Sequence, residues 1–196
     1  YLSIKGNVPL PVVGFVGLLL LIPQGGTFFC YMVILITILK KNIINFHFPS
    51  KSSVMELVRC ISIIMQFWPI LFLISNLSKF LLPEFQEQAI VSELKYTEKK
   101  LAIVLYAMIV APLVEELYFR YYLYISIKKK YGVILASLGT SFLFALVHQN
   151  VLSFGILLTL GLFLNLVSEY FGKIIYSICC HSIFNGIMII LILNPF

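Results

Sequence analysis

The chain has 196 residues, of which 61% are hydrophobic and only 11% are charged, with a formal net charge of +6 and a mean hydropathy of +1.03. An ordinary soluble domain is about 45–50% apolar and about 25% charged, so a soluble chain with so few charges would not cover its surface. The composition therefore predicts an integral membrane protein that has the bilayer as its solvent.

The kinds of charged residue exclude several classes of protein. All eight acidic residues are glutamate, which excludes a Ser-His-Asp triad, an aspartic-protease dyad and an EF-hand. The sequence contains no Gly-rich phosphate loop of the Walker type. Its basic residues are scattered between apolar runs, which favours orienting loop charges over a nucleic-acid partner. The four cysteines have no metal-ligand spacing and are interpreted as buried thiols.

Apolar runs separated by short polar clusters predict an all-α membrane protein, a bundle of about seven transmembrane helices. In chain order, the runs cover residues 8–22, 27–39, 57–78, 101–126, 132–148, 151–168 and 173–193. The first two are shorter than the roughly 20 residues of a typical span, so they are compatible with two short spans or with one hairpin. We expect a single membrane domain, in which residues 1–100 give support and residues 101–193 form the functional core.

The loop cations predict how the chain is oriented. If the N-terminus is inside, nine Lys and Arg residues lie in inside loops and four lie in outside loops. An excess of positive charge is typical of cytoplasmic loops. We therefore expect the N-terminus to be inside, in a bacterial plasma membrane.

Polar side chains inside the last spans predict a functional site. These side chains are Glu115, Glu116, Arg120, His148, His181 and Asn185. A Glu or Arg near the centre of a membrane helix costs roughly 2.5–3.5 kcal/mol to insert, so such residues are expected to face the interior of the bundle. Since three different spans contribute them, we expect one shared internal site.

Helical spacing indicates which of these side chains can meet within one helix. Glu116 and Arg120 are four residues apart, so they can form an ion pair. Glu115 is rotated by about 100° around the helix axis and is free to face elsewhere. His181 and Asn185 are also four residues apart and share one helix face.

Depth in the membrane gives an independent argument. The fourth and fifth spans are expected to form a hairpin around the Lys-rich turn near residue 130. Glu115 and His148 lie at similar distances from this turn, and at about 1.5 Å per residue their depths differ by only about 5 Å. We therefore expect them to meet across the hairpin. Phe144 places an aromatic ring next to His148, and Pro112 is expected to kink the helix just before Glu115.

These residue types suit hydrolysis of a peptide or amide bond inside the membrane. A carboxylate and an imidazole that share one water can polarise it for attack on a carbonyl carbon. A second histidine and an asparagine on one helix face can donate hydrogen bonds to the developing oxyanion. This chemistry requires no nucleophilic side chain and does not necessarily require a metal.

The same residues resemble the motifs of a known family. Three patterns occur in order: Glu-Glu-x-x-x-Arg at 115–120, Phe-x-x-x-His at 144–148 and His-x-x-x-Asn at 181–185. Together they are similar to the three motifs of the CPBP family, also called the Abi family, which contains CAAX proteases and bacteriocin-processing membrane proteins. The resemblance covers about residues 101–193.

The resemblance implies an intramembrane endopeptidase and a role for each motif residue. It implies that Glu115 and His148 activate the water, and that His181 and Asn185 form the oxyanion site. The orienting residues that it implies are Glu116, Arg120 and Phe144.

Metal dependence is not uniform in this family, because relatives are described both as metalloproteases and as metal-free, glutamate-dependent proteases. This sequence has no His-Glu-x-x-His pair, so we expect no cofactor. If zinc is present, its expected ligands are Glu115, His148 and His181.

Other functions are compatible with the same sequence. The Glu116–Arg120 pair could serve only as a structural ion pair, and the protein could be a non-catalytic immunity or scaffold protein of the same fold. A small proton-coupled transporter would need an intramembrane glutamate such as Glu115, but not His181 together with Asn185. The expected partners of a protease are a peptide or lipidated protein substrate and membrane lipid, with no nucleic acid. The sequence predicts neither the natural substrate nor the oligomeric state.

Overall fold

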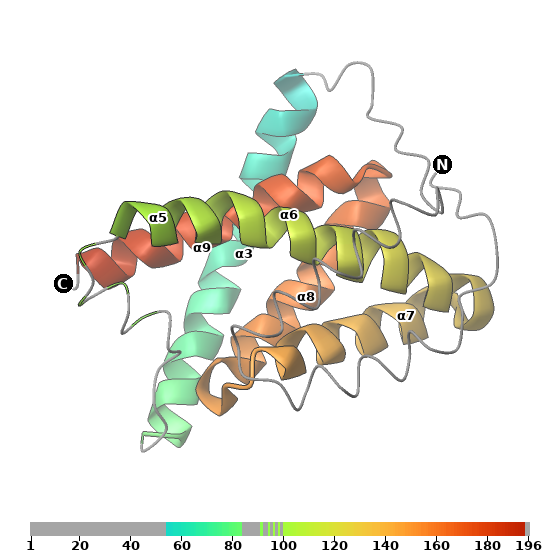
Figure 1. Cartoon of the computed structure of the whole chain (residues 1–196). Helices are drawn as coiled ribbons and strands as arrows, with labels where there is room; N and C mark the ends of the chain where they lie inside the picture. The colour runs from blue at the N-terminus through green and yellow to red at the C-terminus, as the bar shows by residue number, and fades with distance from the viewer. Residues whose placement is uncertain are drawn as a thin grey trace.

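In the computed structural model, residues 54–83, 91, 94, 96, 98 and 100–194 are described, and every regular element among them is a helix (Figure 1). In chain order, these elements are α3 (Val54–Leu81), α5 (Lys100–Leu105), η1 (Tyr106–Val110), α6 (Ala111–Glu116), η2 (Leu117–Tyr124), α7 (Ile125–Val147), α8 (Val151–Phe171) and α9 (Ile174–Leu193). The elements η1 and η2 are π-helical. The predicted all-α class is confirmed for this part of the chain.

Long apolar helices identify the protein as an integral membrane protein. Four stretches of the described chain are long and apolar enough to cross a bilayer: Val58–Leu81, Lys100–Val147, Val151–Phe171 and Ile174–Leu193. The prediction of about seven spans is not confirmed, and its first two runs, 8–22 and 27–39, lie outside the described residues.

A glycine corner folds the longest stretch back on itself. Lys100–Val147 covers 48 residues, but Gly132 has φ 83° and ψ 175°, which no helix contains. Glycine adopts this conformation without a steric penalty because it has no Cβ atom. In Figure 1 the chain from α5 to η2 runs toward this corner, and α7 returns below it. The predicted hairpin is therefore present.

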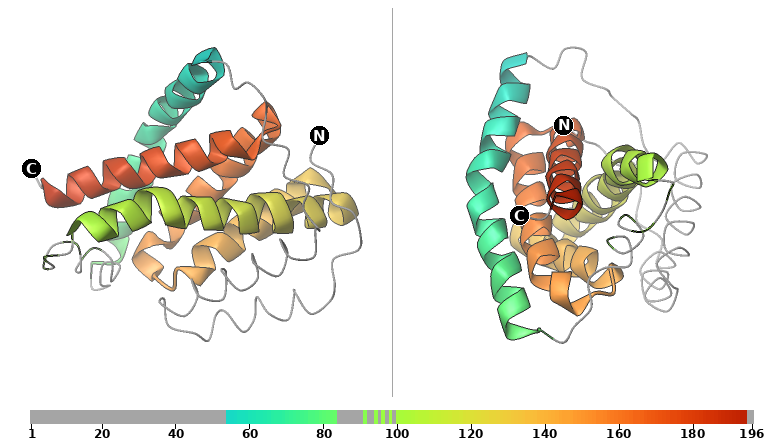
Figure 2. Two further views of the ribbon diagram at one scale, coloured as in Figure 1. Left: turned by 45° about the horizontal axis from the view of Figure 1, so that its top comes forward. Right: turned by 90° about the vertical axis from the view of Figure 1, so that its left-hand side faces the viewer.

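Helix α3 covers one edge of the bundle and exposes most of its surface. In the right-hand view of Figure 2 it stands upright beside α8 and α9. Cys60, Ile64 and Leu71 are fully buried, and their spacing forms a single apolar stripe toward the other helices. The Cys60 Sγ lies 2.9 Å from the Cys180 Sγ on α9, and both thiols are buried, as predicted.

Small and polar residues hold α7 and α8 close together. A Cβ atom on Gly161 would lie 3.0 Å from the Cα atom of Ser141, so this glycine permits close approach of the two backbones. Asn165 on α8 is fully buried and donates hydrogen bonds of 3.0 Å to the hydroxyls of Thr140 and Ser141 on α7. Small side chains and interhelical hydrogen bonds are typical of membrane helix packing, where no hydrophobic force drives helices together.

The helix that carries the two adjacent glutamates is widened on both sides of them. The π-helical elements η1 and η2 flank the six-residue α6, which has Pro112 in its first turn. The sequence predicts that Pro112 kinks this span, and the structure instead accommodates the proline next to a π-helical segment. Such segments insert an extra residue per turn and occur frequently at functional sites. Glu115 and Glu116 are the last two residues of α6.

Candidate active site

Glu115 lies between two imidazole rings that come from different helices. Its Oε2 atom is 4.0 Å from the Nε2 atom of His148 and 3.8 Å from the Nε2 atom of His181. His148 follows α7, and His181 is on α9. The meeting of Glu115 with His148 agrees with the depth argument, and the structure adds His181 to the same carboxylate.

The turn after α7 positions His148. Helix α7 ends at this residue because Gln149 has a φ of 51°, which lies outside the helical region. Asn150 then caps α8, since its side-chain oxygen accepts a hydrogen bond from the amide of Ser153 at 2.9 Å. The Nδ1 atom of His148 lies 2.7 Å from the Phe144 carbonyl oxygen. A carbonyl only accepts, so Nδ1 carries the proton and donates, which leaves Nε2 facing Glu115.

Glu116 positions His181. Its Oε1 atom lies 2.9 Å from the Nδ1 atom of His181 and 2.9 Å from an Nη atom of Arg120. A carboxylate paired with a guanidinium is an acceptor, so the His181 Nδ1 atom is the donor. The Nε2 atom is therefore directed to Glu115, and the two adjacent glutamates hold opposite sides of one imidazole.

Arg120 is anchored at three places in the bundle interior. It pairs with Glu116 on its own helix, as predicted, and its Nη2 atom donates a hydrogen bond of 3.3 Å to the Gly161 carbonyl on α8. Its guanidinium carbon lies 4.6 Å from the centre of the Phe144 ring, a distance at which a cation is attracted to the ring face. These contacts keep the charge fixed where its side chain is only 1% exposed.

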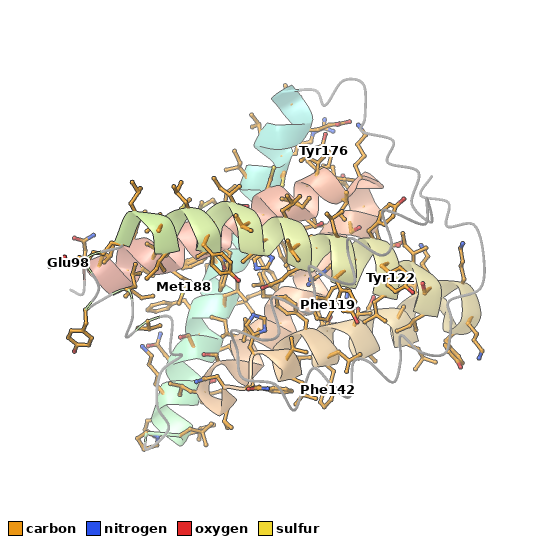
Figure 3. The ribbon with its side chains drawn as sticks, in the orientation of Figure 1. Glu98, Phe119, Tyr122, Phe142, Tyr176 and Met188 are labelled. Atoms are coloured by element: carbon orange, nitrogen blue, oxygen red, sulfur yellow. The ribbon has the colours of Figure 1, made fainter. Side chains whose placement is uncertain are left out.

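Phe144 is the aromatic centre of the site. Its ring is fully buried and has edge contacts with the rings of His148 and His181, with centres 4.9 and 5.7 Å apart. It also contacts Phe119 edge-on at 5.2 Å, and Phe119 lies in the middle of the bundle in Figure 3. The ring predicted beside His148 thus supports both histidines and Arg120.

Exposure separates the site into two parts. The side chains of His148 and Glu115 are 24% and 17% exposed. Those of Glu116 and His181 are 0% and 3% exposed. The pair formed by Glu115 and His148 is therefore partly open, whereas Glu116 and His181 are closed off.

Asn185 lies on the same helix as His181 but makes its contact elsewhere. Its side-chain amide donates a hydrogen bond of 2.8 Å to the Ala107 carbonyl oxygen in η1. His181 and Asn185, which were predicted to share one face of α9, therefore contact different parts of the neighbouring span. His181 contacts Glu116, and Asn185 contacts Ala107.

The spacing of the Glu115 carboxylate and the imidazoles of His148 and His181 suits a shared water. A water about 2.8 Å from both the Glu115 Oε2 atom and the His148 Nε2 atom would bridge them at an angle of about 90°. Zinc ligands lie at about 2.0–2.2 Å from the metal. Within the described part of the chain, no group of three His, Cys, Asp or Glu residues is arranged to hold a metal ion. When unprotonated, the Nε2 atoms of His148 and His181 nonetheless have the ligand type that zinc prefers.

Several contacts of the site are not apparent from the sequence. The hydrogen bond between Glu116 and His181 joins residues 65 positions apart, and helical spacing predicts contacts only within one helix. Gly161 is one small residue in an apolar run, so its role as acceptor for Arg120 has no sequence signal. The Ala107 carbonyl is a backbone group, and Pro112 removes its donor only in the π-helical register, which the sequence does not predict.

Comparison with protein families matches the part of the chain that builds this site. Residues 97–187 match the family described as type II CAAX prenyl endopeptidase, Rce1-like. Neither the comparison with curated proteins nor the comparison with solved structures gives a match. The matched range contains every residue of the three motifs, from Glu115 to Asn185.

Proposed function

We propose that this protein, whose residues 97–187 match the Rce1-like type II CAAX prenyl endopeptidase family, is an intramembrane endopeptidase that uses a glutamate-activated water. Its substrate would be a membrane-associated peptide that is hydrophobic or prenylated. The observation that carries the proposal is the position of the partly exposed Glu115 carboxylate, 3.8 and 4.0 Å from two imidazole Nε2 atoms.

The first step is attack of the water on the scissile carbonyl carbon. The water lies between Glu115 and the Nε2 atom of His148, which holds it in place. Glu115 accepts a proton from the water as the new carbon–oxygen bond forms, and the carbonyl oxygen becomes an oxyanion. General base catalysis of this kind contributes typically 10²–10⁴-fold to a rate.

The oxyanion is stabilised by donors on α9. His181 can donate from Nε2 only when its ring is doubly protonated, because Nδ1 already donates to Glu116. In that form, the Nε2 hydrogen would be the donor that His181 offers to the oxyanion. The amide of Asn185 has two hydrogens and bonds the Ala107 carbonyl with one of them, so the other is available to the oxyanion.

The last step breaks the carbon–nitrogen bond. Glu115 returns its proton to the departing amine nitrogen, the tetrahedral intermediate collapses, and the carboxylate is regenerated. One carboxylate thus acts first as a base and then as an acid. The roles of Glu116, Arg120 and Phe144 are to orient His181 and His148.

The loop charges support an orientation with the N-terminus inside a bacterial plasma membrane. Nine of the loop cations then lie on the inside. In this orientation the Lys-rich corner at Gly132 faces the cytoplasm. The end of α7 at His148 would then face the outer side of the membrane, and the substrate peptide would enter the site from that side.

Purified protein in detergent tests the activity with a farnesylated CAAX peptide and with a hydrophobic leader peptide. We expect cleavage of at least one of them, and loss of cleavage in Glu115→Ala and in His148→Ala. Lys128→Ala is the control, because this lysine lies at the far end of α7 and binds Glu169. Equal cleavage by all three variants would exclude the proposed mechanism. A folded protein that cleaves neither peptide would favour a scaffold or a proton-coupled transporter.

Chelation tests whether the water is activated without a metal. We expect cleavage to survive exhaustive chelation, because the spacing around Glu115 suits a bridging water. If zinc is required, Glu115, His148 and His181 would hold it, and the ion would polarise the attacking water. Loss of cleavage on chelation, reversed by added zinc, would replace the metal-free mechanism.

A further inference from the structure

The carbonyl of Ala107 lacks a donor within its own helix. In an α-helix it would accept the amide hydrogen of Ala111, but that amide donates to the Tyr106 carbonyl, five residues earlier. In this π-helical register, the donor for Ala107 would be residue 112, which is proline and has no amide hydrogen. Ala107 is buried, and a buried carbonyl without a donor is unfavourable.

Asn185 supplies the missing donor from a different helix. Its Nδ2 atom lies 2.8 Å from the Ala107 oxygen, which is a normal hydrogen-bond length. The contact joins residues 78 positions apart. The side chain therefore takes the place of the amide that Pro112 lacks.

The residue next to Asn185 also contacts the π-helical segment. Gly186 is buried, and a Cβ atom there would lie 2.8 Å from the terminal methyl carbon of Met108 in η1, so the Met108 side chain would have to move. The absence of a side chain at Gly186 therefore leaves room for Met108 near the level where Asn185 reaches Ala107. Two adjacent residues of α9 thus contact η1.

We propose that Asn185 is a positioning residue that holds η1 in the π-helical register and thereby sets the direction of Glu115. This inference rests on the proposed function, since it concerns the same carboxylate. If η1 relaxed to an α-helix, Ala111 would donate to Ala107, and the extra residue would leave the turn. One residue corresponds to a rotation of about 100° around the helix axis.

Such a rotation would turn Glu115 away from the two imidazoles. The helix before the π segment is held by apolar packing, since Ile103 and Val104 of α5 pack against a buried cluster that contains Ile189 of α9. With that part held, the rotation would appear in α6, which carries Glu115. A displacement of about 1 Å at a catalytic group can reduce a rate by about 10²-fold.

A double-mutant cycle between Asn185 and Pro112 tests this role. Pro112→Ala restores an amide hydrogen that can bond the Ala107 carbonyl, so the side-chain donor is no longer needed. We expect Asn185→Ala to lower kcat by more than about 10³-fold in the native background, because it removes both an oxyanion donor and the support of η1. In the Pro112→Ala background the same change is expected to lower kcat by at least about 10-fold less, because only the oxyanion contact is then lost. Equal losses in the two backgrounds would overturn the positioning role.

Hydrogen exchange of the amides in 106–116 provides a readout that is independent of activity. Asn185→Ala is expected to accelerate this exchange in the native background and to leave it nearly unchanged in Pro112→Ala. Asn76→Ala is the matched control, because Asn76 is an exposed residue of α3 whose amide bonds the Phe72 carbonyl of its own helix. Unchanged exchange in the native background would overturn the proposed link between Asn185 and η1. If neither the native protein nor any variant cleaves a peptide, the proposed function is wrong. The hydrogen-exchange measurements on the same variants still decide whether Asn185 holds η1 in its π-helical register.

Discussion

Glu115 and Glu116 are neighbours in the sequence, yet they occupy opposite kinds of surroundings. Glu116 is fully buried, pairs with Arg120 at 2.9 Å and accepts a hydrogen bond from His181. Glu115 is partly exposed, and its nearest imidazole nitrogens are 3.8 and 4.0 Å away. The carboxylate with close partners is suited to hold other groups in place. The carboxylate with looser contacts keeps room for a water and has lone pairs available for its proton.

The difference between these two carboxylates indicates that neighbouring residues of one helical turn can have separate roles, one structural and one catalytic. A shift of one residue rotates the side chain by about 100°, which is enough to direct it to the exposed or the closed part of the site. Exposure follows the same division, because His148 is on the side of Glu115 and Arg120 is on the side of Glu116. Replacing each glutamate should therefore affect a different property.

Glu115→Gln is expected to have the largest effect, on activity alone. Glutamine keeps the shape of the side chain but cannot accept the proton of the water, so kcat should fall by about 10²–10⁴-fold. Because Glu115 is partly exposed and makes no close ion pair, the free energy of unfolding should change by less than about 0.5 kcal/mol. Peptide cleavage and thermal unfolding in the same detergent measure both quantities. Full activity of this variant would remove Glu115 as the base.

Glu116→Gln is expected to act mainly on stability. It leaves the buried Arg120 charge without its partner, and breaking a buried ion pair in this way costs about 3–5 kcal/mol. The double variant Glu116→Gln/Arg120→Met removes both charges and should recover part of that loss. Thermal unfolding of the single and double variants tests the expectation. A single variant as stable as the native protein would mean that Glu116 and Glu115 do not differ in the way described above.

Gly161→Ala tests the packing behind the closed part of the site. Its Cβ atom would lie 3.0 Å from the backbone of Ser141, so α7 and α8 must move apart and Arg120 loses its short contact to the Gly161 carbonyl. Overpacking of this kind typically costs about 1–3 kcal/mol. Gly139→Ala on α7 is the matched control, since a Cβ atom there meets nothing within 4 Å and alanine favours the helix. The two variants should change the unfolding temperature in opposite directions, and a shared direction would contradict the close approach at Gly161.

Lys128→Ala is expected to have the smallest effect. Lys128 binds the Glu169 carboxylate at 2.6 Å, but both side chains are about one third exposed, at 37% and 34%. Exposed ion pairs contribute about 0–1 kcal/mol, and salt screens them. Unfolding at low and high salt should therefore differ little between variant and native protein, with unchanged cleavage. A loss of activity here would show that the Lys-rich end of the hairpin is coupled to the site.

The contacts of Glu115 show why part of the site was predictable from the sequence. Its contact with His148 follows from the constant rise per helical residue and from the position of the turn near residue 130. The polar cluster at that turn marks its position in the sequence. The pair of Glu116 and Arg120 depends on spacing within one helix turn, which is also regular. These two rules, applied to ionisable residues in apolar spans, predict both contacts, but they do not predict the position of His181.

The contact of Asn185 with Ala107 shows why the rest was not predictable. The π-helical segment before Pro112 adds a residue to the turn, so helical phase cannot be carried across it from the sequence pattern. The sequence predicts a kink at Pro112. The structure has a widened, π-helical turn instead, which also makes room for the proline ring. Likewise, the Glu116–His181 bond depends on how α9 lies against α6, and the apolar runs contain no information on that arrangement.

The pairing of Glu116 with Arg120 also bears on how the protein is made. His181 is 65 residues further along the chain than Glu116, so the helix with both glutamates emerges from the ribosome well before α9. During that interval Glu116 lacks the hydrogen bond from His181. An arginine one turn from Glu116 neutralises that carboxylate within the same helix and lowers the cost of entering the bilayer. The helix thus carries its own counter-ion into the membrane, and α9 completes the site when it arrives.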